Sequence, residues 1–160
     1  MPPGLPFEIR TSPIQGLGAF ATEPIPAGAR LIEYAGERLT PQAAETRYPE
    51  ARGEGEGEGE GEGGRHHTFL FAIDDHVVVD AAVNGNLARF LNHSCAPNCD
   101  AVIDDDRIWI ETLHDIAPGE ELCYDYAYVL PERHSSRAKR RFPCSCGALT
   151  CRGTMLTKKR

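Results

Sequence analysis

The chain has 160 residues, a net charge of −7 and 41% hydrophobic residues, a composition that fits one domain with one modest core rather than two. Its N-terminus lacks a charged start followed by an apolar run, and no apolar stretch approaches the roughly 20 residues that cross a membrane. We therefore expect a soluble, unexported intracellular protein without a membrane partner.

The charge is unevenly distributed along the chain. Five acids belong to one run, and without them the net charge is −2: Glu54, Glu56, Glu58, Glu60 and Glu62. From Glu132 onward, nine Lys or Arg residues face this single acid, a local balance of +8. Such a C-terminal segment is typical either of a solvated terminus that aids solubility or of a surface that meets nucleic acid or an acidic protein.

The predicted elements are one short helix and several short strands. Thr40 reads as a helix N-cap with Pro41 in the first turn, and this helix is predicted to end near residues 48–49. The alternating Gly and Glu residues at 53–64 predict a disordered surface insertion, because they offer nothing to bury. Strands are predicted over 31–34, 69–73, 77–79, 101–103, 108–111 and 121–126.

Turn signals separate these strands, and they argue for a mainly β (α+β) fold. Three consecutive aspartates, residues 104–106, stand between apolar runs and predict a hairpin turn, and Ala117-Pro118-Gly119 predicts another loop. No βαβ repetition is present, which excludes a doubly wound nucleotide-binding fold.

Three cysteines near the C-terminus form the pattern C-x-C-x4-C: Cys144, Cys146 and Cys151. Zinc in a closed structural site takes four N or S ligands, so this pattern favours a zinc site that needs one more ligand. A disulfide framework and unrelated buried thiols are the alternatives. The lack of an export signal disfavours disulfides.

Taken one at a time, the other polar and aromatic signals are weak. The pair Gly16-x-Gly18 could mark an ordinary turn, and Asn92-His93 could stabilise a loop. The alternation Tyr124-x-Tyr126 fits ordinary core packing on a strand. Their order along the chain is more specific than any of them alone.

That order resembles a SET-domain protein lysine methyltransferase with a post-SET zinc-binding tail. The segments that carry the resemblance are 16–20, 32–37, 80–81, 85–86, 89–98 and 119–126, followed by the three C-terminal cysteines. The resemblance implies a fold of small curved β-sheets with a C-terminal pseudoknot. It implies a SET domain over 8–130, a post-SET zinc-binding segment over 140–156 and a basic tail over 157–160.

For the methyl donor, S-adenosyl-L-methionine, the resemblance implies one continuous site. Gly16, Leu17 and Gly18 would contribute main-chain contacts, and Asn92 and His93 would recognise the adenine and amino-acid ends. Three further side chains complete the expected donor site: Phe69, Arg89 and Phe142. Phe69 stands where relatives often have tyrosine, so we expect only ring packing from it. Arg89 could instead be structural, paired with an acid such as Asp80, and Phe142 could either cover the adenine or pack on the zinc loop.

For the acceptor and the metal, the resemblance implies further roles. Tyr126 matches the catalytic tyrosine, Tyr34 matches a tyrosine of the lysine channel, and Tyr124 matches a position that influences how many methyl groups are added. We expect mainly mono- or dimethylation from Tyr124. Cys95 would be the fourth ligand of a structural Zn²⁺, which would join the tail to the active-site loop. Cys99 and Cys123 are left over, and Cys123 is expected to be a buried small hydrophobe.

The resulting hypothesis is a protein-lysine N-methyltransferase whose substrate is a lysine-containing protein, such as a histone tail. The alternative is a catalytically silent SET-fold module that binds chromatin or another protein. A eukaryotic protein of this kind would act in the nucleus, and a bacterial one in the cytoplasm or on host chromatin. If the protein contacts nucleic acid, we expect the basic C-terminal segment to make that contact.

Overall fold

The computed structural model describes residues 4–49, 69–130 and 133–158. The Gly/Glu run predicted to be a disordered insertion lies outside the described residues. No helix among these described ranges is long and apolar enough to cross a membrane.

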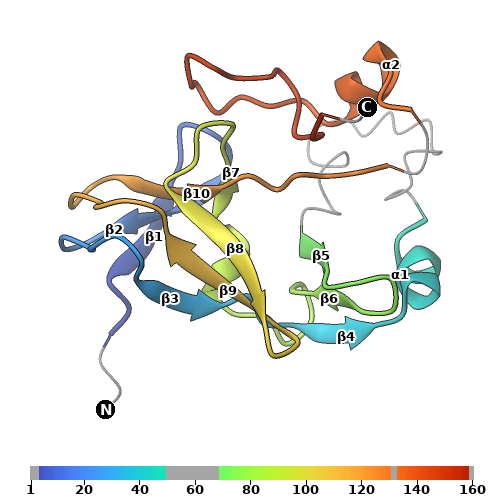
Figure 1. Cartoon of the computed structure of the whole chain (residues 1–160), viewed down its shortest axis with the longest axis horizontal. Helices are drawn as coiled ribbons and strands as arrows, with labels where there is room; N and C mark the ends of the chain where they lie inside the picture. Colours follow the sequence, from blue (N-terminus) through green and yellow to red (C-terminus); the bar gives the residue numbers. More distant parts are fainter. Residues whose placement is uncertain (1–3, 50–68, 131–132, 159–160) are drawn as a thin grey trace.

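Within the described ranges, ten short strands form three small sheets (Figure 1). The first sheet has the order β1-β2-β10-β7, with β1 at Phe7–Thr11, β2 at Leu17–Ala21, β10 at Glu121–Tyr124 and β7 at Asn92–His93. The second has the order β3-β9-β8, with β3 at Arg30–Glu33, β9 at Arg107–Thr112 and β8 at Cys99–Asp104. The third has the order β4-β6-β5, with β4 at Glu37–Leu39, β6 at Val78–Asp80 and β5 at Leu70–Ala72. The prediction of a mainly β fold built from small sheets is confirmed.

The hairpin between β8 and β9 turns at the predicted aspartates. Asp104 pairs with Arg107, so the connection has two residues, Asp105 and Asp106, with φ angles of 51° and 59°. Two residues with positive φ define a type I′ turn, whose twist matches that of the flanking strands. Aspartate tolerates this left-handed conformation better than most side chains, which explains why this sequence turns here.

The two α-helices are short and capped by hydroxyl side chains. Helix α1 (Pro41–Arg47) begins as predicted, with the Thr40 side chain accepting a hydrogen bond from the Ala43 N–H at 3.1 Å. Helix α2 (Ser136–Arg141) was not predicted, although its N-cap follows the same rule: Ser135 accepts from the Ala138 N–H at 3.1 Å. A 3₁₀ turn, η3 (Leu87–Phe90), leads into β7.

Six of the ten described strands were predicted from the sequence, and four were not. The six predicted strands correspond to β3, β5, β6, β8, β9 and β10, with boundaries shifted by at most two residues. Strands β1, β2, β4 and β7 were not predicted. In β2 the residues after Leu17 are buried on both faces of the sheet, so no alternating pattern marks this strand.

The main core lies where the first two sheets pack together. Its fully buried members include Leu91, Ile110, Ile116 and Leu122. A separate small cluster consists of Leu130, Ala138, Phe142 and Leu156, and it anchors the C-terminal segment. In Figure 1 this segment, coloured red, runs along the top of the view on the side of β10 and β7.

The parallel contact between β7 and β10 brings distant segments together. Asn92 pairs with Cys123 and His93 with Tyr124. Asn98 closes the crossing from the other side, because its side chain donates to the Glu121 carbonyl and accepts from the Cys123 N–H. Residues 121–126 therefore run against the loop 91–98, which is the contact that the expected pseudoknot requires.

The left-handed turn makes a prediction about stability. Replacing Asp106 with Gly relieves the strain of a positive φ, whereas Val at this position adds a β-branched side chain that the conformation disfavours. We expect the Asp106→Gly variant to be more stable than the Asp106→Val variant by at least about 1 kcal/mol. Urea unfolding of both variants measures this difference, and equal midpoints would contradict the assigned turn.

Candidate active site

Two pockets share Tyr126 as a lining residue. The first has a volume of about 360 Å³ and is lined by the glycine loop at 14–17, by Arg89, Asn92 and His93, and by the tail residues Cys144 and Met155, among others. The second has a volume of about 520 Å³ and is lined by β5, by the segment 124–130 and by Phe142. Tyr126 is the residue common to the linings of these two pockets, so their walls meet at this side chain.

The glycine loop of the first pocket is the turn between β1 and β2. Gly16 has a φ of 46°, and its carbonyl accepts a hydrogen bond from the Ser12 N–H at 2.8 Å. At Gly18 a Cβ would lie 2.1 Å from the Glu121 Oε1, so only glycine lets the carboxylate pack against this strand. Of the three predicted donor-binding residues of this loop, Gly16 and Leu17 line the pocket, and Gly18 lies behind it against Glu121.

Asn92 fastens the glycine loop to β10. Its side-chain nitrogen donates to the carbonyls of Gln15 and Leu17 at 3.2 and 3.0 Å, and to the Glu121 Oε1 at 2.9 Å. Ser12 donates its hydroxyl to the same carboxylate at 2.8 Å. The amide hydrogens of Asn92 are thus directed at protein acceptors, which leaves its Oδ1 as the atom available to a ligand.

His93 connects the pocket to Tyr126 and to a cysteine. Its Nδ1 accepts a hydrogen bond from the Tyr126 N–H at 3.0 Å, and its Nε2 lies 3.4 Å from the Cys95 Sγ. Burial lowers the pKa of His93 to about 4, against the opposing effect of the Asp125 carboxylate. The ring is therefore neutral near pH 7, with its proton on Nε2 directed at the sulfur.

Arg89 and Phe69 both line the first pocket, and the guanidinium of Arg89 lies over two aromatic rings. Its Cζ is 5.9 Å from the centre of Phe69 and 4.8 Å from that of Phe90. The alternative that Arg89 pairs with Asp80 is wrong. The Asp80 carboxylate is fully buried and pairs with Arg47 at 3.0 Å instead, because α1 packs on β6.

Phe142 does not line the first pocket. Its buried ring meets Tyr128 edge-on, with 5.9 Å between centres, and it lines the second pocket. Pro143 and Met155 from the same tail line the first pocket in its place. Sequence reasoning missed Met155, since no motif marks it. Its main-chain N–H donates to the Phe142 carbonyl at 2.8 Å, beside an isolated bridge between Pro143 and Thr154.

Tyr124 and Tyr126 lie in a continuous row of aromatic rings. Their ring centres are 4.8 Å apart, and Phe71 and Tyr128 extend the row at 6.2 and 5.5 Å. The Tyr126 hydroxyl donates to the Leu91 carbonyl at 2.5 Å. Burial raises the pKa of Tyr124 and of Tyr126 well above the usual value, so both phenols stay protonated at neutral pH.

Tyr34 is buried behind this row and lines neither pocket. Its ring packs against Phe71 at 5.4 Å between centres, and its hydroxyl donates to the Phe69 carbonyl at 2.8 Å. This bond fixes the end of β5 where Phe69 enters the first pocket. In this conformation Tyr34 supports the site from the second layer of side chains, which differs from the expected position in the channel.

Four cysteine sulfurs come together beside the first pocket. The Sγ atoms of Cys95, Cys144, Cys146 and Cys151 all lie within 4.8 Å of one another. Four thiolates around zinc, with bonds of about 2.3 Å, have sulfurs about 3.8 Å apart, so the cluster has the dimensions of such a site. Burial opposes ionisation of Cys146, yet hydrogen bonds from neighbouring groups outweigh it and lower the pKa of this thiol to about 6.

The remaining thiols, Cys99 and Cys123, are buried in the sheets as small hydrophobes, as predicted for Cys123. Burial raises the pKa of Cys99 to about 12, and that of Cys123 is raised for the same reason. Both therefore remain uncharged thiols.

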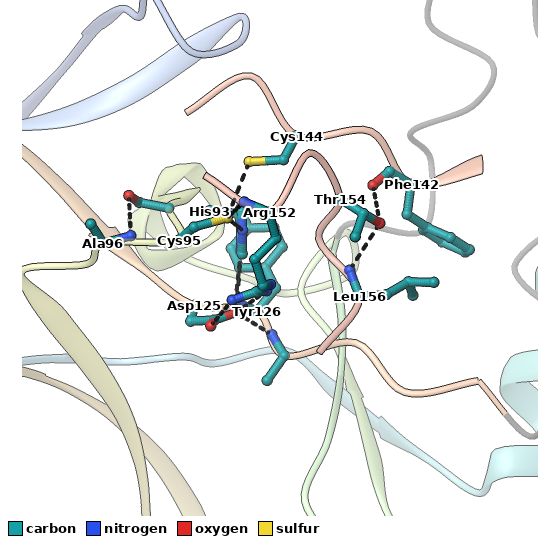
Figure 2. Close-up of polar contacts among 12 residues, drawn as sticks. His93, Cys95, Ala96, Asp125, Tyr126, Phe142, Cys144, Arg152, Thr154 and Leu156 are labelled. Carbon is teal, nitrogen blue, oxygen red and sulfur yellow. Dashed lines mark hydrogen bonds and ion pairs between the residues drawn. The ribbon is translucent and has the colours of Figure 1, made fainter. Parts of the chain in front are cut away.

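An ion pair joins the cysteine-rich tail to the segment after β10 that carries Tyr126 (Figure 2). Arg152 donates from both terminal nitrogens to Asp125, at 2.7 and 3.1 Å, and its main-chain N–H donates to the Cys95 Sγ at 3.4 Å. Burial tends to raise the pKa of Asp125, but hydrogen bonds from Arg152 and from the Ala127 N–H lower it overall. Figure 2 shows Arg152 reaching from the tail across His93 toward Asp125.

The sequence matches the family model of the SET domain over residues 16–127. The chain therefore belongs to the SET-domain family. Membership of this methyltransferase family implies S-adenosyl-L-methionine as the methyl donor.

Several curated relatives are similar over most of this chain. One is the "Histone-lysine N-methyltransferase, H3 lysine-4 specific" of Chaetomium globosum, 41% identical over 152 residues, which are 92% of this chain and 13% of the relative. The protein of the same name from Schizosaccharomyces pombe is 43% identical over 146 residues, 89% of this chain and 14% of the relative. "Histone-lysine N-methyltransferase trithorax" of Drosophila virilis is 41% identical over 147 residues, 88% of this chain and 3% of the relative. The chain thus spans a small part of each relative.

The ion pair between Arg152 and Asp125 makes a prediction about the tail. Replacing Arg152 with Gln removes the charge and one of the two hydrogen bonds, which we expect to weaken tail docking by about 1 kcal/mol for a partly exposed pair. Amide hydrogen exchange of residues 144–156 should accelerate about fivefold. Arg137→Gln, at an exposed residue of α2, is the matched control and should leave this exchange unchanged. Unchanged exchange in the Arg152 variant would contradict the coupling.

Proposed function

We propose that this chain transfers methyl groups from S-adenosyl-L-methionine to the ε-amine of lysine in a protein substrate. The observation that carries this proposal is the position of Tyr126 between two pockets. Transfer of a methyl group is an in-line displacement, in which the nucleophile and the leaving group lie on opposite sides of the carbon. Two pockets that meet at one side chain supply this alignment, and alignment is the main catalytic requirement of the reaction.

The first pocket suits the donor because it combines main-chain groups, an amide oxygen and aromatic surface. Gly16 and Leu17 allow close approach of the ligand, Asn92 offers its Oδ1, and Phe69 offers a ring. The donor supplies an activated methyl group on a sulfonium. Arg89 and His93 complete the wall of this pocket. Phe142 does not line this pocket. We expected Phe142 to cover the adenine of the donor, and Met155 takes that role in our proposal.

The second pocket suits a lysine side chain because aromatic rings form much of its wall. Tyr124, Tyr126 and Phe71 provide a surface on which an alkyl chain packs and an ammonium is tolerated. Lysine must lose a proton before it attacks, and desolvation in this pocket together with the nearby positive donor lowers the pKa of its amine. The Tyr126 phenol stays protonated, so it orients the reacting groups and does not act as a base. Tyr34 contributes by holding Phe69 in place.

The substrate that the relatives support best is the N-terminal tail of histone H3. Two of the relatives cited above carry names specific for lysine 4 of this histone. These names do not favour the alternative of a silent binding module. A histone substrate implies a nuclear, chromatin-bound setting. The exposed cations of α2, Arg137, Lys139 and Arg140, supply a surface for nucleic acid beside the site.

The four clustered cysteines hold a structural Zn²⁺ in this proposal. The spacing of their sulfurs supports a closed tetrahedral site. Cys95 belongs to the loop that also carries Asn92 and His93, so the metal ties the tail to the donor pocket. Zinc here stabilises structure and takes no part in the transfer.

Replacement of Tyr126 by Phe tests the catalytic assignment. Loss of the hydroxyl removes the bond to Leu91 that holds the ring in place, and misplacement of reacting groups costs about 100-fold in rate. We expect kcat on an H3 tail peptide to fall by about this factor while calorimetry still detects donor binding. Tyr48→Phe is the control, because the Tyr48 hydroxyl bonds Asp80 away from both pockets. Turnover equal to wild type in the Tyr126 variant would refute the role of its hydroxyl.

Replacement of Cys146 by Ser tests the metal assignment. A serine hydroxyl is a poor zinc ligand, so we expect the purified variant to lose bound zinc and to bind the donor more weakly. Cys99→Ala, at a buried thiol outside the cluster, should keep its zinc. Elemental analysis of the wild type and both variants measures their zinc content. A wild-type protein that is metal-free and fully active would overturn the zinc assignment.

A further inference from the structure

The Glu121 carboxylate lies one side chain behind the wall of the first pocket. Its Oε1 accepts a hydrogen bond at 2.9 Å from the Asn92 side chain, and Asn92 lines that pocket. Ser12, which is buried, donates its hydroxyl to the two carboxylate oxygens at 2.8 and 2.9 Å. A Cβ at Gly18 would collide with Oε1, so β2 carries glycine where the carboxylate packs against it. Three residues from separate segments thus fix the carboxylate behind the pocket.

The groups that hold the Glu121 carboxylate are neutral. Its partners are a hydroxyl and an amide, and no ion pair is found for it among the residues that the structure describes. Asp125, next to Tyr126, differs, because Arg152 pairs with it at 2.7 Å. Glu121 is half-buried, and a carboxylate withdrawn from water is stabilised more by a cation than by neutral donors. Its position therefore suits a positively charged ligand.

The charge of Glu121 acts on the place where the two pockets meet. Burial is the main cause that raises the pKa of the Tyr126 phenol, and the Glu121 carboxylate is one of several groups that raise it further. The charged groups among the described lining residues of the first pocket are the guanidinium groups of Arg89 and Arg141. Glu121 therefore places a negative charge, which no ion pair offsets, behind a wall that otherwise carries cations.

We propose that Glu121 makes the first pocket distinguish the methyl donor from the demethylated product by their difference in charge. This inference rests on the proposed function. In the transfer, the bond between the methyl carbon and sulfur breaks, its electron pair stays on sulfur, and the lysine nitrogen forms the new bond to carbon. The sulfonium cation becomes an uncharged thioether, and the positive charge passes to the methylated amine. Glu121 attracts the donor more than the product, which limits competition by the product for the pocket.

The comparison of these two ligands isolates the charge. Donor and product share the adenosine and amino-acid ends, so contacts with these ends cancel in the ratio of the two affinities. A variant that only disturbs the pocket weakens both ligands alike and leaves the ratio unchanged. A variant that removes a charge acting on the sulfur changes the ratio.

Calorimetry of wild type and Glu121→Gln with S-adenosyl-L-methionine and with S-adenosyl-L-homocysteine measures this ratio. Glutamine keeps the shape of the side chain, and the Ser12 hydroxyl can accept a hydrogen bond from its amide. A screened interaction between one half-buried charge and one ligand charge is worth about fivefold in affinity. We expect the ratio of donor affinity to product affinity to fall about fivefold in Glu121→Gln. An unchanged ratio would overturn the proposal.

Two further variants separate charge from structure. Glu120→Gln removes an exposed charge from the neighbouring residue, whose carboxylate accepts from the Ala117 N–H, and it should keep the wild-type ratio. Ser12→Ala removes a neutral hydrogen bond from the Glu121 carboxylate and keeps its charge, so it should also keep this ratio. A loss in Ser12→Ala equal to that in Glu121→Gln would contradict an effect of charge.

A salt titration of wild type tests the proposal without a substitution. Added salt screens the attraction between Glu121 and the sulfonium, so the ratio of donor affinity to product affinity should fall as the salt concentration rises. A ratio that rises with salt would contradict the proposal, because the guanidinium groups of Arg89 and Arg141 would then dominate the field at the sulfur.

Methylation of an H3 tail peptide is measured separately, since the binding experiments contain no peptide. A ratio lowered in Glu121→Gln, in a protein that transfers no methyl group, would reject the proposed activity but support the role of Glu121. Methyl transfer together with an unchanged ratio would reject the role of Glu121 alone. Failure of wild type to bind the donor would reject both.

Discussion

The arrangement of this site depends on the crossing of two chain segments, residues 91–98 and 121–126. Tyr126 is fixed there at both ends: its hydroxyl donates to the Leu91 carbonyl and its main-chain N–H donates to His93. Both acceptors belong to the same loop, so the ring that separates the two pockets cannot shift without moving the loop. The Asn98 side chain joins the two segments by two further hydrogen bonds to backbone groups of β10. Several bonds, and not one, therefore fix the position of Tyr126.

The same loop couples three parts of the molecule that are distant in sequence. Asn92 fastens the glycine loop, His93 contacts Tyr126, and Cys95 joins the thiol cluster of the tail. Arg152 of the tail also pairs with Asp125, the residue before Tyr126, and so connects the tail to this segment a second time. The tail and the first pocket are therefore linked through the same loop. In our proposal, loss of the zinc would disturb the first pocket through Cys95, although the cysteines contact no reacting atom.

Much of the fold was predictable because its signals are local. Aspartates that tolerate positive φ indicated the β8–β9 turn, and Thr40 with Pro41 indicated the start of α1. The three cysteines within eight residues indicated the metal site for the same reason. Strand β2 lacks an alternating pattern because its residues after Leu17 are all buried, and α2 is too short and too basic to show an apolar face. Local patterns fail where burial comes from both sides or where a single buried residue, Ala138, anchors a helix.

The sequence alone was enough to identify the chemical groups that are present, their order and the family of the chain. It could not determine their partners. Asp80 pairs with Arg47 and not Arg89, Phe142 lines the second pocket and not the first, and the hydroxyl of Tyr34 is bound to Phe69. Each choice depends on which buried surfaces pack together, and these surfaces come from segments tens of residues apart. The hydroxyl of Tyr128 is another case, because only the folded chain shows that it is buried without a hydrogen-bond partner among the described residues.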